Sequence, residues 1–524
     1  MKQHRAYWAM LAGIVALAGL TASSARAADE FERIREKAAE MLVSLNDGVY
    51  ATFADGKNSA LQRTYGDYGY LLTPSKLDDL KKLVGQAGDP AERQRRETTS
   101  RLLRYHAMRA SAAPVIDNAM NTMRDKGIAV EEGQVVLRGL NYRLGREANQ
   151  DVRRKWTLAS SELYTSINVY LKNLMLDMDT QARKLGYEGY YEFLREAEAW
   201  DVALLEAAAE SLLTSTQASY AAALDRWALK ELDLPTRRMR SFDAPRLLYL
   251  PGLSRSVKGP APEEVADKAL ADVGIQLSGQ RNLRLDLKDR AGREPEARAY
   301  ALSTGRTRVA MTPSGYVTDV QDLLGAYGEA QFYYSIPGNT PFEAAYFGTN
   351  ILPSIYRELF AGLATEPAWV ARHLKLDGVG AEEVAEAMRF RSLLRAREAA
   401  GRLLFQLELH ANPAIDPGRY NQVMERALIW PRISVDAEAY LLANDDYRSG
   451  GLVLGAMIAA QIRDALRREW GEEWFRRPEL AKRLEQGASR GYAMTIDEFL
   501  KIWKLDGIHM EPLQAEYHRE GSGS

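Results

Sequence analysis

The segment TRVAMTPSGY (residues 307–316) is followed two residues later by DVQDLLGAYGEAQFYY (residues 319–334), and these two stretches decide the fold. Thr307–Met311 has the length and composition of a β-strand. From Asp319 onward the apolar residues recur at helical spacing, after a glycine that marks a turn. The sequence therefore predicts a short strand that leads almost directly into a long helix.

The residues before this segment predict two more strands. Three leucines alternate with charged residues, which is the period-2 pattern of a half-buried strand: Leu283, Leu285 and Leu287. Ala297–Ser303 has the length of a second strand and ends at the turn Thr304-Gly305. Prolines and glycines interrupt helical patterns between residues 234 and 313. We therefore expect a small antiparallel β-sheet next to the helix over residues 319–334.

Most of the remaining chain has the spacing of amphipathic helices. Near the start, six apolar residues fall on one stripe: Phe31, Ile34, Ala38, Met41, Leu42 and Leu45. Thr73 and Pro74 have the residue types of an N-cap and a first helical turn. A long helix is predicted from about Asp151 to Leu185. The fold class is mainly α, with an N-terminal helical region over residues 28–236 and a second region over residues 237–517.

The composition is that of a globular protein with a large core. The chain has 524 residues, of which 46% are hydrophobic and 27% are charged. Its formal net charge of −2 argues against nucleic acid as a partner, because phosphate binding needs a basic surface. The chain contains no cysteine, which excludes disulfides, thiolate nucleophiles and cysteine-bound zinc.

The first 27 residues have the features of a signal peptide. A basic start (Met1–Arg5) precedes an apolar run (Trp8–Leu20), and Ala25-Arg26-Ala27 fits the small-x-small pattern of a cleavage site. We expect cleavage after Ala27 and a periplasmic or secreted protein with no membrane anchor. The apolar stretch Gly451–Ile462 is too short to span a bilayer and predicts a buried helix. Residues 518–524 are expected to be a disordered tail.

No motif of enzyme chemistry is evident in the residues themselves. The six histidines include no pair spaced four apart, so no helix presents two imidazoles to one metal. The chain also lacks the Gly-x-Ser-x-Gly elbow, the phosphate-binding glycine loop and the dinucleotide fingerprint. A single histidine such as His410 is more often a hydrogen-bonded structural residue than a catalyst. The sequence therefore contains no motif that would support a hydrolase with an unrelated nucleophile.

The chain nevertheless resembles a known peptidase family over roughly residues 151–517. The strand and helix quoted above, NILPSIYRELFAGLATEPAWVARHL, LFQLELHANPAIDPGRY, QARKLGYEGYYEFL and DDYRSGGLVLGAMIAAQIRDALRREWGEEWF are similar to segments of the thimet oligopeptidase and oligoendopeptidase F family. Angiotensin-converting enzyme and carboxypeptidase Taq are more distant relatives with the same architecture. The resemblance implies a two-lobed helical oligopeptidase-like (gluzincin) fold and, for active members, zinc-dependent peptide hydrolysis.

The catalytic motif of that family is degenerate in this chain. The family carries His-Glu-x-Gly-His-Ala on the first helix and a zinc-binding Glu on the next. The corresponding positions here hold Gly325 for the first His, Ala326 for the catalytic Glu, Glu329 for the second His and Ser354 for the later Glu. Gly450-Gly451 occupies the place expected for a tyrosine that stabilises the transition state. One carboxylate and one hydroxyl are too few donors for catalytic zinc, and no general base remains.

We therefore expect an exported pseudo-metallopeptidase with no metal ligand, no cofactor and no catalytic residue, which binds peptides or a periplasmic protein partner. The residues expected to line a ligand cleft are Tyr327, Glu329, Ser354, Tyr447 and Arg448. The alternative hypothesis is an active metallo-oligopeptidase with an atypical metal site. Its carboxylate ligands would come from Asp319, Asp322, Glu329 or Glu343.

Overall fold

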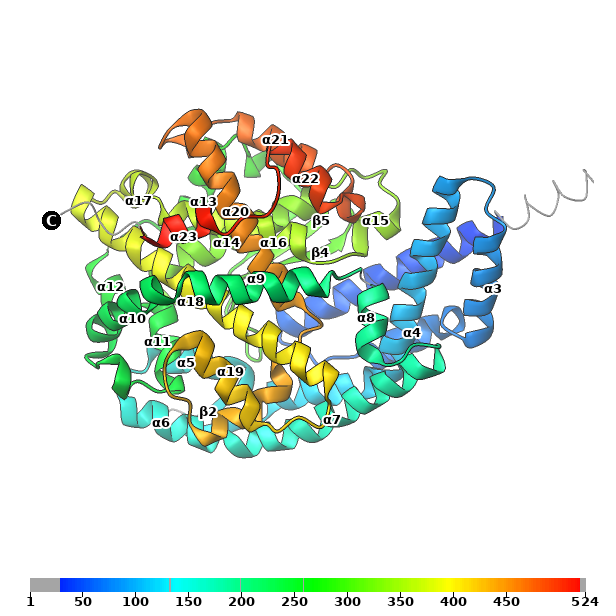
Figure 1. Cartoon of the computed structure of the whole chain (residues 1–524), viewed down its shortest axis with the longest axis horizontal. Helices are drawn as coiled ribbons and strands as arrows, with labels where there is room; N and C mark the ends of the chain where they lie inside the picture. The colour runs from blue at the N-terminus through cyan, green and yellow to red at the C-terminus, as the bar shows by residue number, and fades with distance from the viewer. Residues whose placement is uncertain (1–28, 132, 198, 258, 519–524) are drawn as a thin grey trace, which may run out of the picture.

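A computed structural model describes residues 29–518, apart from residues 132, 198 and 258 (Figure 1). The predicted signal peptide and most of the predicted tail lie outside the described residues. After a helix over residues 29–53, the helices before the central sheet are α2 (Leu61–Tyr68), α3 (Pro74–Gly85), α4 (Pro90–Asp125), α5 (Leu140–Arg146), α6 (Gln150–Ala159), α7 (Ser161–Lys184), α8 (Tyr190–Ala197), α9 (Val202–Ser215), α10 (Gln217–Leu232), α11 (Ala244–Tyr249), α12 (Pro251–Ser256) and α13 (Pro262–Asp272).

The chain then passes through a small sheet and returns to helices. The later helices are α14 (Thr318–Ser335), α15 (Phe342–Tyr346), α16 (Ile351–Ala361), α17 (Pro367–Leu374), α18 (Gly378–Ala411), α19 (Gly418–Leu428), α20 (Arg448–Trp470), α21 (Glu479–Ala488), α22 (Ile496–Ile502) and α23 (Glu511–His518). This architecture confirms the mainly α fold class. The predicted helix after the strand is α14, which begins one residue before Asp319.

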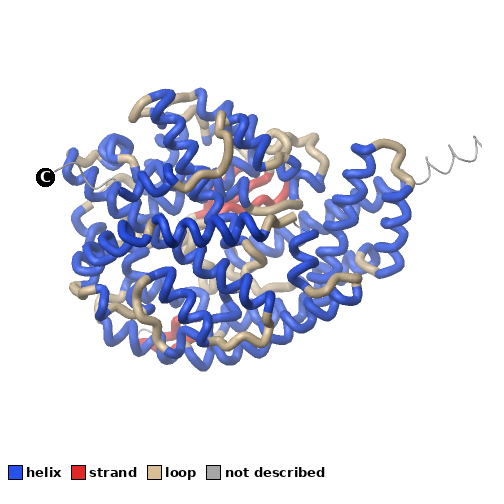
Figure 2. The backbone as a smooth tube through the Cα atoms, in the orientation of Figure 1, coloured by secondary structure: helices blue, strands red, loops and turns tan. Residues whose placement is uncertain are grey.

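The central sheet has three strands, β3 (Leu283–Asp286), β4 (Arg298–Ser303) and β5 (Arg306–Ala310), in the order β3-β5-β4. Figure 2 shows it among the helices in the middle of the molecule. β4 and β5 pair antiparallel across the predicted turn, but β3 pairs parallel with β5. The expectation of a wholly antiparallel sheet is therefore wrong in this detail. Alternation of side chains reports which face of a strand is buried, and it does not specify the neighbouring strand.

A second, two-stranded sheet formed by β1 (Gly127–Val130) and β2 (Gly133–Val136) follows α4. The helix predicted from Asp151 to Leu185 is divided into α6 and α7 at Ser160. The Ser160 hydroxyl donates to the Thr157 carbonyl oxygen, and its backbone N–H donates to the carbonyls of Trp156 and Thr157. These bonds tighten the last turn of α6, and the apolar spacing continues across the break.

The N-terminal helices form their own apolar cluster at one end of the long axis (Figure 1). All six residues of the predicted stripe, from Phe31 to Leu45, are buried in it. The Thr73 side chain accepts a hydrogen bond from the Lys76 N–H, which confirms the predicted N-cap of α3. Phe342 and Tyr346 of α15 pack against this cluster, so the N-terminal helices are joined to the segment between α14 and α16.

The largest buried cluster contains residues from Met108 to Leu513 and so lies on both sides of position 236. Gly451–Ile462 forms the middle of α20, and nearly all of its residues are buried, as predicted. Among the helices of the described residues, none combines the length and the apolar character needed to cross a membrane.

Candidate functional site

Helices α14 and α16 pack closely against each other, as the predicted pair of motif helices should. Of the two glycines of α14, Gly328 lies closer to α16: a Cβ atom there would lie 2.3 Å from the carbonyl oxygen of Tyr356 and 2.8 Å from a ring carbon of Phe360. Real Cβ atoms do not come this close to a backbone oxygen, so only glycine fits at this position. Gly328 therefore allows the close packing of α14 on α16.

Gly325 and Ala326, the positions of the first His and the catalytic Glu, lie in the buried middle of α14. A Cβ atom on Gly325 would lie 3.3 Å from Cγ of Arg357 and 3.4 Å from Cβ of Ala361. The space beside Gly325 is therefore filled by side chains of α16. Ala326 has no exposed surface. Neither residue supplies a donor atom to a ligand.

Glu329, the position of the second His, is held by an ion pair. Its carboxylate lies 3.2 Å from a guanidinium nitrogen of Arg357 and accepts a hydrogen bond of 3.0 Å from the Tyr333 hydroxyl. Arg357 also donates to the Ala297 carbonyl oxygen, just before β4. The charge of Glu329 is thereby neutralised by Arg357 of α16.

Ser354 lies on α16, and its described contacts are with the N-cap residue of its own helix and with α20. Its hydroxyl accepts a hydrogen bond of 3.3 Å from the Asn350 amide, and the same amide donates to the Arg448 carbonyl oxygen. A Cβ atom on Gly455 of α20 would lie 2.8 Å from Cβ of Ser354. Ser354 therefore packs against α20, whereas the residue of α16 that meets Glu329 is Arg357.

Asp319 and Asp322, two ligands of the alternative hypothesis, are fully engaged. Asp319 accepts hydrogen bonds from the Ser314 hydroxyl and from the backbone N–H groups of Ser314 and Gly315, so it fixes the turn before α14. Asp322 lies 2.6 Å from Arg391 and 2.6 Å from Arg395 of α18. Burial opposes ionisation of Asp322, but the two guanidinium groups outweigh it and hold its pKa well below the usual range.

Glu343 of α15 pairs with Arg35 at 3.0 Å, at the junction with the N-terminal helices. The four carboxylates of the alternative hypothesis thus have separate partners. In residues 29–518, with the gaps given above, no three His, Asp or Glu side chains come together in a way that could hold a metal ion.

The aromatic residues expected in a cleft are buried. Tyr327 has 4% of its surface exposed, and burial raises its pKa, with a further contribution from Asp267 and Glu263. Tyr447 has no exposed surface, and its hydroxyl hydrogen-bonds to Nδ1 of His410 at 2.7 Å. Arg448, the next residue, is exposed. The side chains of Tyr327 and Tyr447 therefore pack in the interior, and they form no exposed aromatic surface for a ligand.

Sequence reasoning missed a partly buried polar cluster around the buried Tyr447. Asp446 accepts hydrogen bonds from Arg109 at 2.9 Å and from the Tyr190 hydroxyl at 3.0 Å. His410 also hydrogen-bonds to the Asn444 side chain, so both of its ring nitrogens have a partner. Burial lowers the pKa of His410 and favours the neutral imidazole. These residues come from α4, α8, α18 and the loop before α20, so no local pattern could reveal the cluster.

Comparison with known proteins identifies the fold. The structure is similar to that of PZ peptidase A, with a TM-score of 0.66, 12% identity and coverage of 96% of each chain. A protein described as an oligoendopeptidase F gives a TM-score of 0.62, 15% identity and coverage of 95% of this chain and 94% of that one. A carboxypeptidase from Pyrococcus furiosus gives 0.59, 13% identity and coverage of 93% and 98%. No protein-family model and no curated protein matches the sequence.

These similarities establish an oligopeptidase-like fold along nearly the whole chain, and at this level of identity they establish the fold alone. The residues present do not fit the zinc ion that the resemblance implies. Catalytic zinc needs three protein donors. Here the space beside Gly325 is filled by side chains of α16. The charge of Glu329 is neutralised by Arg357, and the Ser354 hydroxyl accepts a hydrogen bond from the Asn350 amide.

Proposed function

We propose that this chain is an exported, non-hydrolytic protein of oligopeptidase-like fold that binds peptides or a protein partner. The observation that carries the proposal is the ion pair between Glu329 and Arg357. A carboxylate that is neutralised by a guanidinium group is a poor metal ligand, and the motif positions beside it offer no donor. Without a metal or a general base, the centre of the fold has no means of activating water.

The sheet supports a peptide-binding role. β4 is an edge strand, because its only hydrogen-bonded neighbour among the described strands is β5. An edge strand has one row of N–H and C=O groups that are free to pair with an extended peptide. Just before this row, the Arg357 guanidinium group donates a hydrogen bond to the Ala297 carbonyl oxygen. Just after it, the backbone N–H of Thr304 donates to the Tyr346 hydroxyl. Between these two contacts lies Arg298–Ser303, whose outer backbone groups pair with no other described strand.

Export is supported by the sequence of residues 1–27 and belongs to the same proposal. Expression of the full chain in a Gram-negative host, followed by fractionation and N-terminal sequencing, tests it. The expected product is periplasmic and begins at Ala28. A product that remains in the cytoplasm with Met1 intact would contradict export.

Two measurements on the purified protein test the loss of hydrolysis. We expect no stoichiometric zinc by elemental analysis and no cleavage of quenched-fluorescence peptides, with or without added zinc. Fluorescence anisotropy with labelled peptides of the same library should show saturable binding. Stoichiometric zinc together with chelator-sensitive cleavage would instead support the alternative of an active metallo-oligopeptidase.

A further inference from the structure

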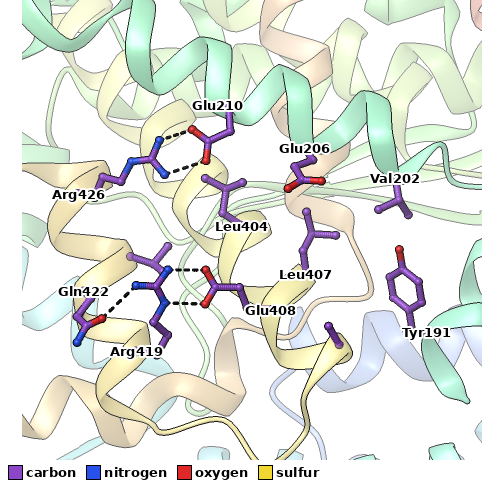
Figure 3. A pocket seen from close by; sticks show the side chains of 12 residues that line it. Tyr191, Val202, Glu206, Glu210, Leu404, Leu407, Glu408, Arg419, Gln422 and Arg426 are labelled. Carbon is purple, nitrogen blue, oxygen red and sulfur yellow. Dashed lines mark hydrogen bonds and ion pairs between the residues drawn. The ribbon is translucent and has the colours of Figure 1, made fainter.

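A cavity of about 430 Å³ lies between α9, α18 and α19, with Tyr191 of α8 beside it (Figure 3). Its volume is within the roughly 300–1,000 Å³ range of small-molecule sites. Its apolar lining consists of Val202, Leu404, Leu407, Ala411 and Val423. Leu404 and Val423 are buried, so the floor of the cavity is continuous with the main core.

Four of the five charged residues around the cavity neutralise one another. Arg419 donates two hydrogen bonds, of 2.6 and 2.7 Å, to the carboxylate of Glu408. Arg426 forms a second bidentate ion pair, with the carboxylate of Glu210 (Figure 3). Paired in this geometry, each arginine fixes the position of its glutamate and contributes no net charge to the cavity.

Glu206 is the charged residue that remains. It takes part in none of the ion pairs or hydrogen bonds of the described residues, and Figure 3 draws no interaction from it. Val202, Glu206 and Glu210 are spaced four apart, so they lie along one face of α9 over about 12 Å. The cavity therefore has an apolar floor and one uncompensated negative charge at its rim.

We propose that this cavity binds an organic cation that carries a primary ammonium group on an apolar body. The ammonium group pairs with Glu206, and the apolar body covers Leu404, Leu407 and Val423. The ring of Tyr191 offers an aromatic surface beside the cation. This site is distinct from the positions of the degenerate motif, and the proposal does not rest on the proposed function.

Calorimetric titration of the full chain with phenethylammonium and with the neutral 2-phenylethanol tests the proposal. We expect saturable binding of both compounds, with about fivefold higher affinity for the ammonium compound, as one exposed ion pair provides. Added salt should reduce this preference and leave the affinity for the alcohol unchanged. Equal affinities for the two compounds, or no saturable binding of phenethylammonium, would overturn the proposal.

Variants locate the binding. Glu206→Gln should lower the affinity for phenethylammonium about fivefold, to that of the alcohol, and leave alcohol binding unchanged. The matched control Glu264→Gln, at an exposed position of α13 outside the cavity, should change neither affinity. Ala411→Phe, at the exposed end of α18, should obstruct part of the cavity and weaken the binding of both compounds. Retention of the ammonium preference in Glu206→Gln, or unchanged affinities in Ala411→Phe, would refute the site.

Discussion

Arg357 of α16 lies 3.2 Å from the carboxylate of Glu329 of α14, at the centre of a fold shared with peptidases. Each side chain is only about a fifth exposed. The same guanidinium group donates to the Ala297 carbonyl oxygen beside the sheet. A single arginine therefore links α14 and α16 to the start of β4.

Arg357→Met is expected to destabilise the protein by about 1–3 kcal/mol, because it leaves the partly buried Glu329 carboxylate without its charged partner. Methionine retains most of the apolar volume of the arginine stem, so the loss reports the guanidinium group. Urea unfolding followed by circular dichroism measures the change.

The double variant Arg357→Met, Glu329→Gln is the matched control for this pair. It should recover part of the stability, because no uncompensated charge remains. If Arg357→Met alone leaves the unfolding midpoint unchanged, the ion pair has no structural role.

The ion pairs of Asp322 with Arg391 and Arg395 predict that the free energy of unfolding depends on pH in the acid range. Its folded-state pKa is well below the unfolded value of about 3.9, because Arg391 and Arg395 outweigh the cost of burial. This contribution to stability is complete above the unfolded pKa and is lost as the pH falls below it toward the folded pKa. Asp322→Asn should cost about 3 kcal/mol at pH 7 and flatten the acid limb of the stability curve.

Asp464→Asn is the control for Asp322. Asp464 pairs with Arg468 on the surface of α20, where an ion pair contributes little. Chemical unfolding at several values between pH 7 and pH 3 should show a normal acid limb for this variant. An unchanged acid limb in Asp322→Asn would contradict the assignment.

The buried imidazole of His106 predicts a second, separate dependence of stability on pH. Burial, with a smaller contribution from the charge of Arg109, lowers its pKa to about 3, and Nδ1 lies 2.9 Å from the Tyr65 hydroxyl. The unfolded chain takes up this proton near pH 6.5. The contribution of the neutral imidazole is therefore complete above pH 6.5 and declines as the pH falls from 6.5 toward 3.

His106→Gln should reduce the slope of stability against pH in this interval, and glutamine can still bond to Tyr65. His509→Gln is the matched substitution at a half-exposed histidine on the surface. Thermal unfolding midpoints between pH 7 and pH 4 distinguish the two variants. Equal slopes in both would exclude His106 as the source.

Local patterns in the sequence predicted the mainly helical character and the three central strands, but they did not predict the hairpin β1–β2, the end of α6 or the pairing between elements. The alternation from Leu283 to Leu287 predicted a strand, yet the parallel pairing with β5 depends on a return of the chain that no local pattern encodes. Likewise, the helical spacing continues through Ser160, where the chain breaks α6 from α7. The motif helices were predicted, but the partners of their carboxylates were not, because Arg391 and Arg395 lie about seventy residues beyond Asp322.

The packing of α14 on α16 gives a prediction that two glycines of one helix can test against each other. Alanine is favoured over glycine by about 1 kcal/mol in a helix interior. At Gly328 this gain is exceeded, because the new Cβ would lie 2.3 Å from the Tyr356 carbonyl oxygen and the two helices must separate. We expect Gly328→Ala to lower the free energy of unfolding by about 2–3 kcal/mol. At Gly325 the nearest atoms are Cγ of the flexible Arg357 side chain, 3.3 Å away, and Cβ of Ala361, 3.4 Å away, so a small shift of the neighbours accommodates a methyl group. Gly325→Ala should therefore change stability by less than about 1 kcal/mol. Urea denaturation of the two variants measures the difference, and equal losses of stability would mean that Gly328 lies no closer to α16 than Gly325 does.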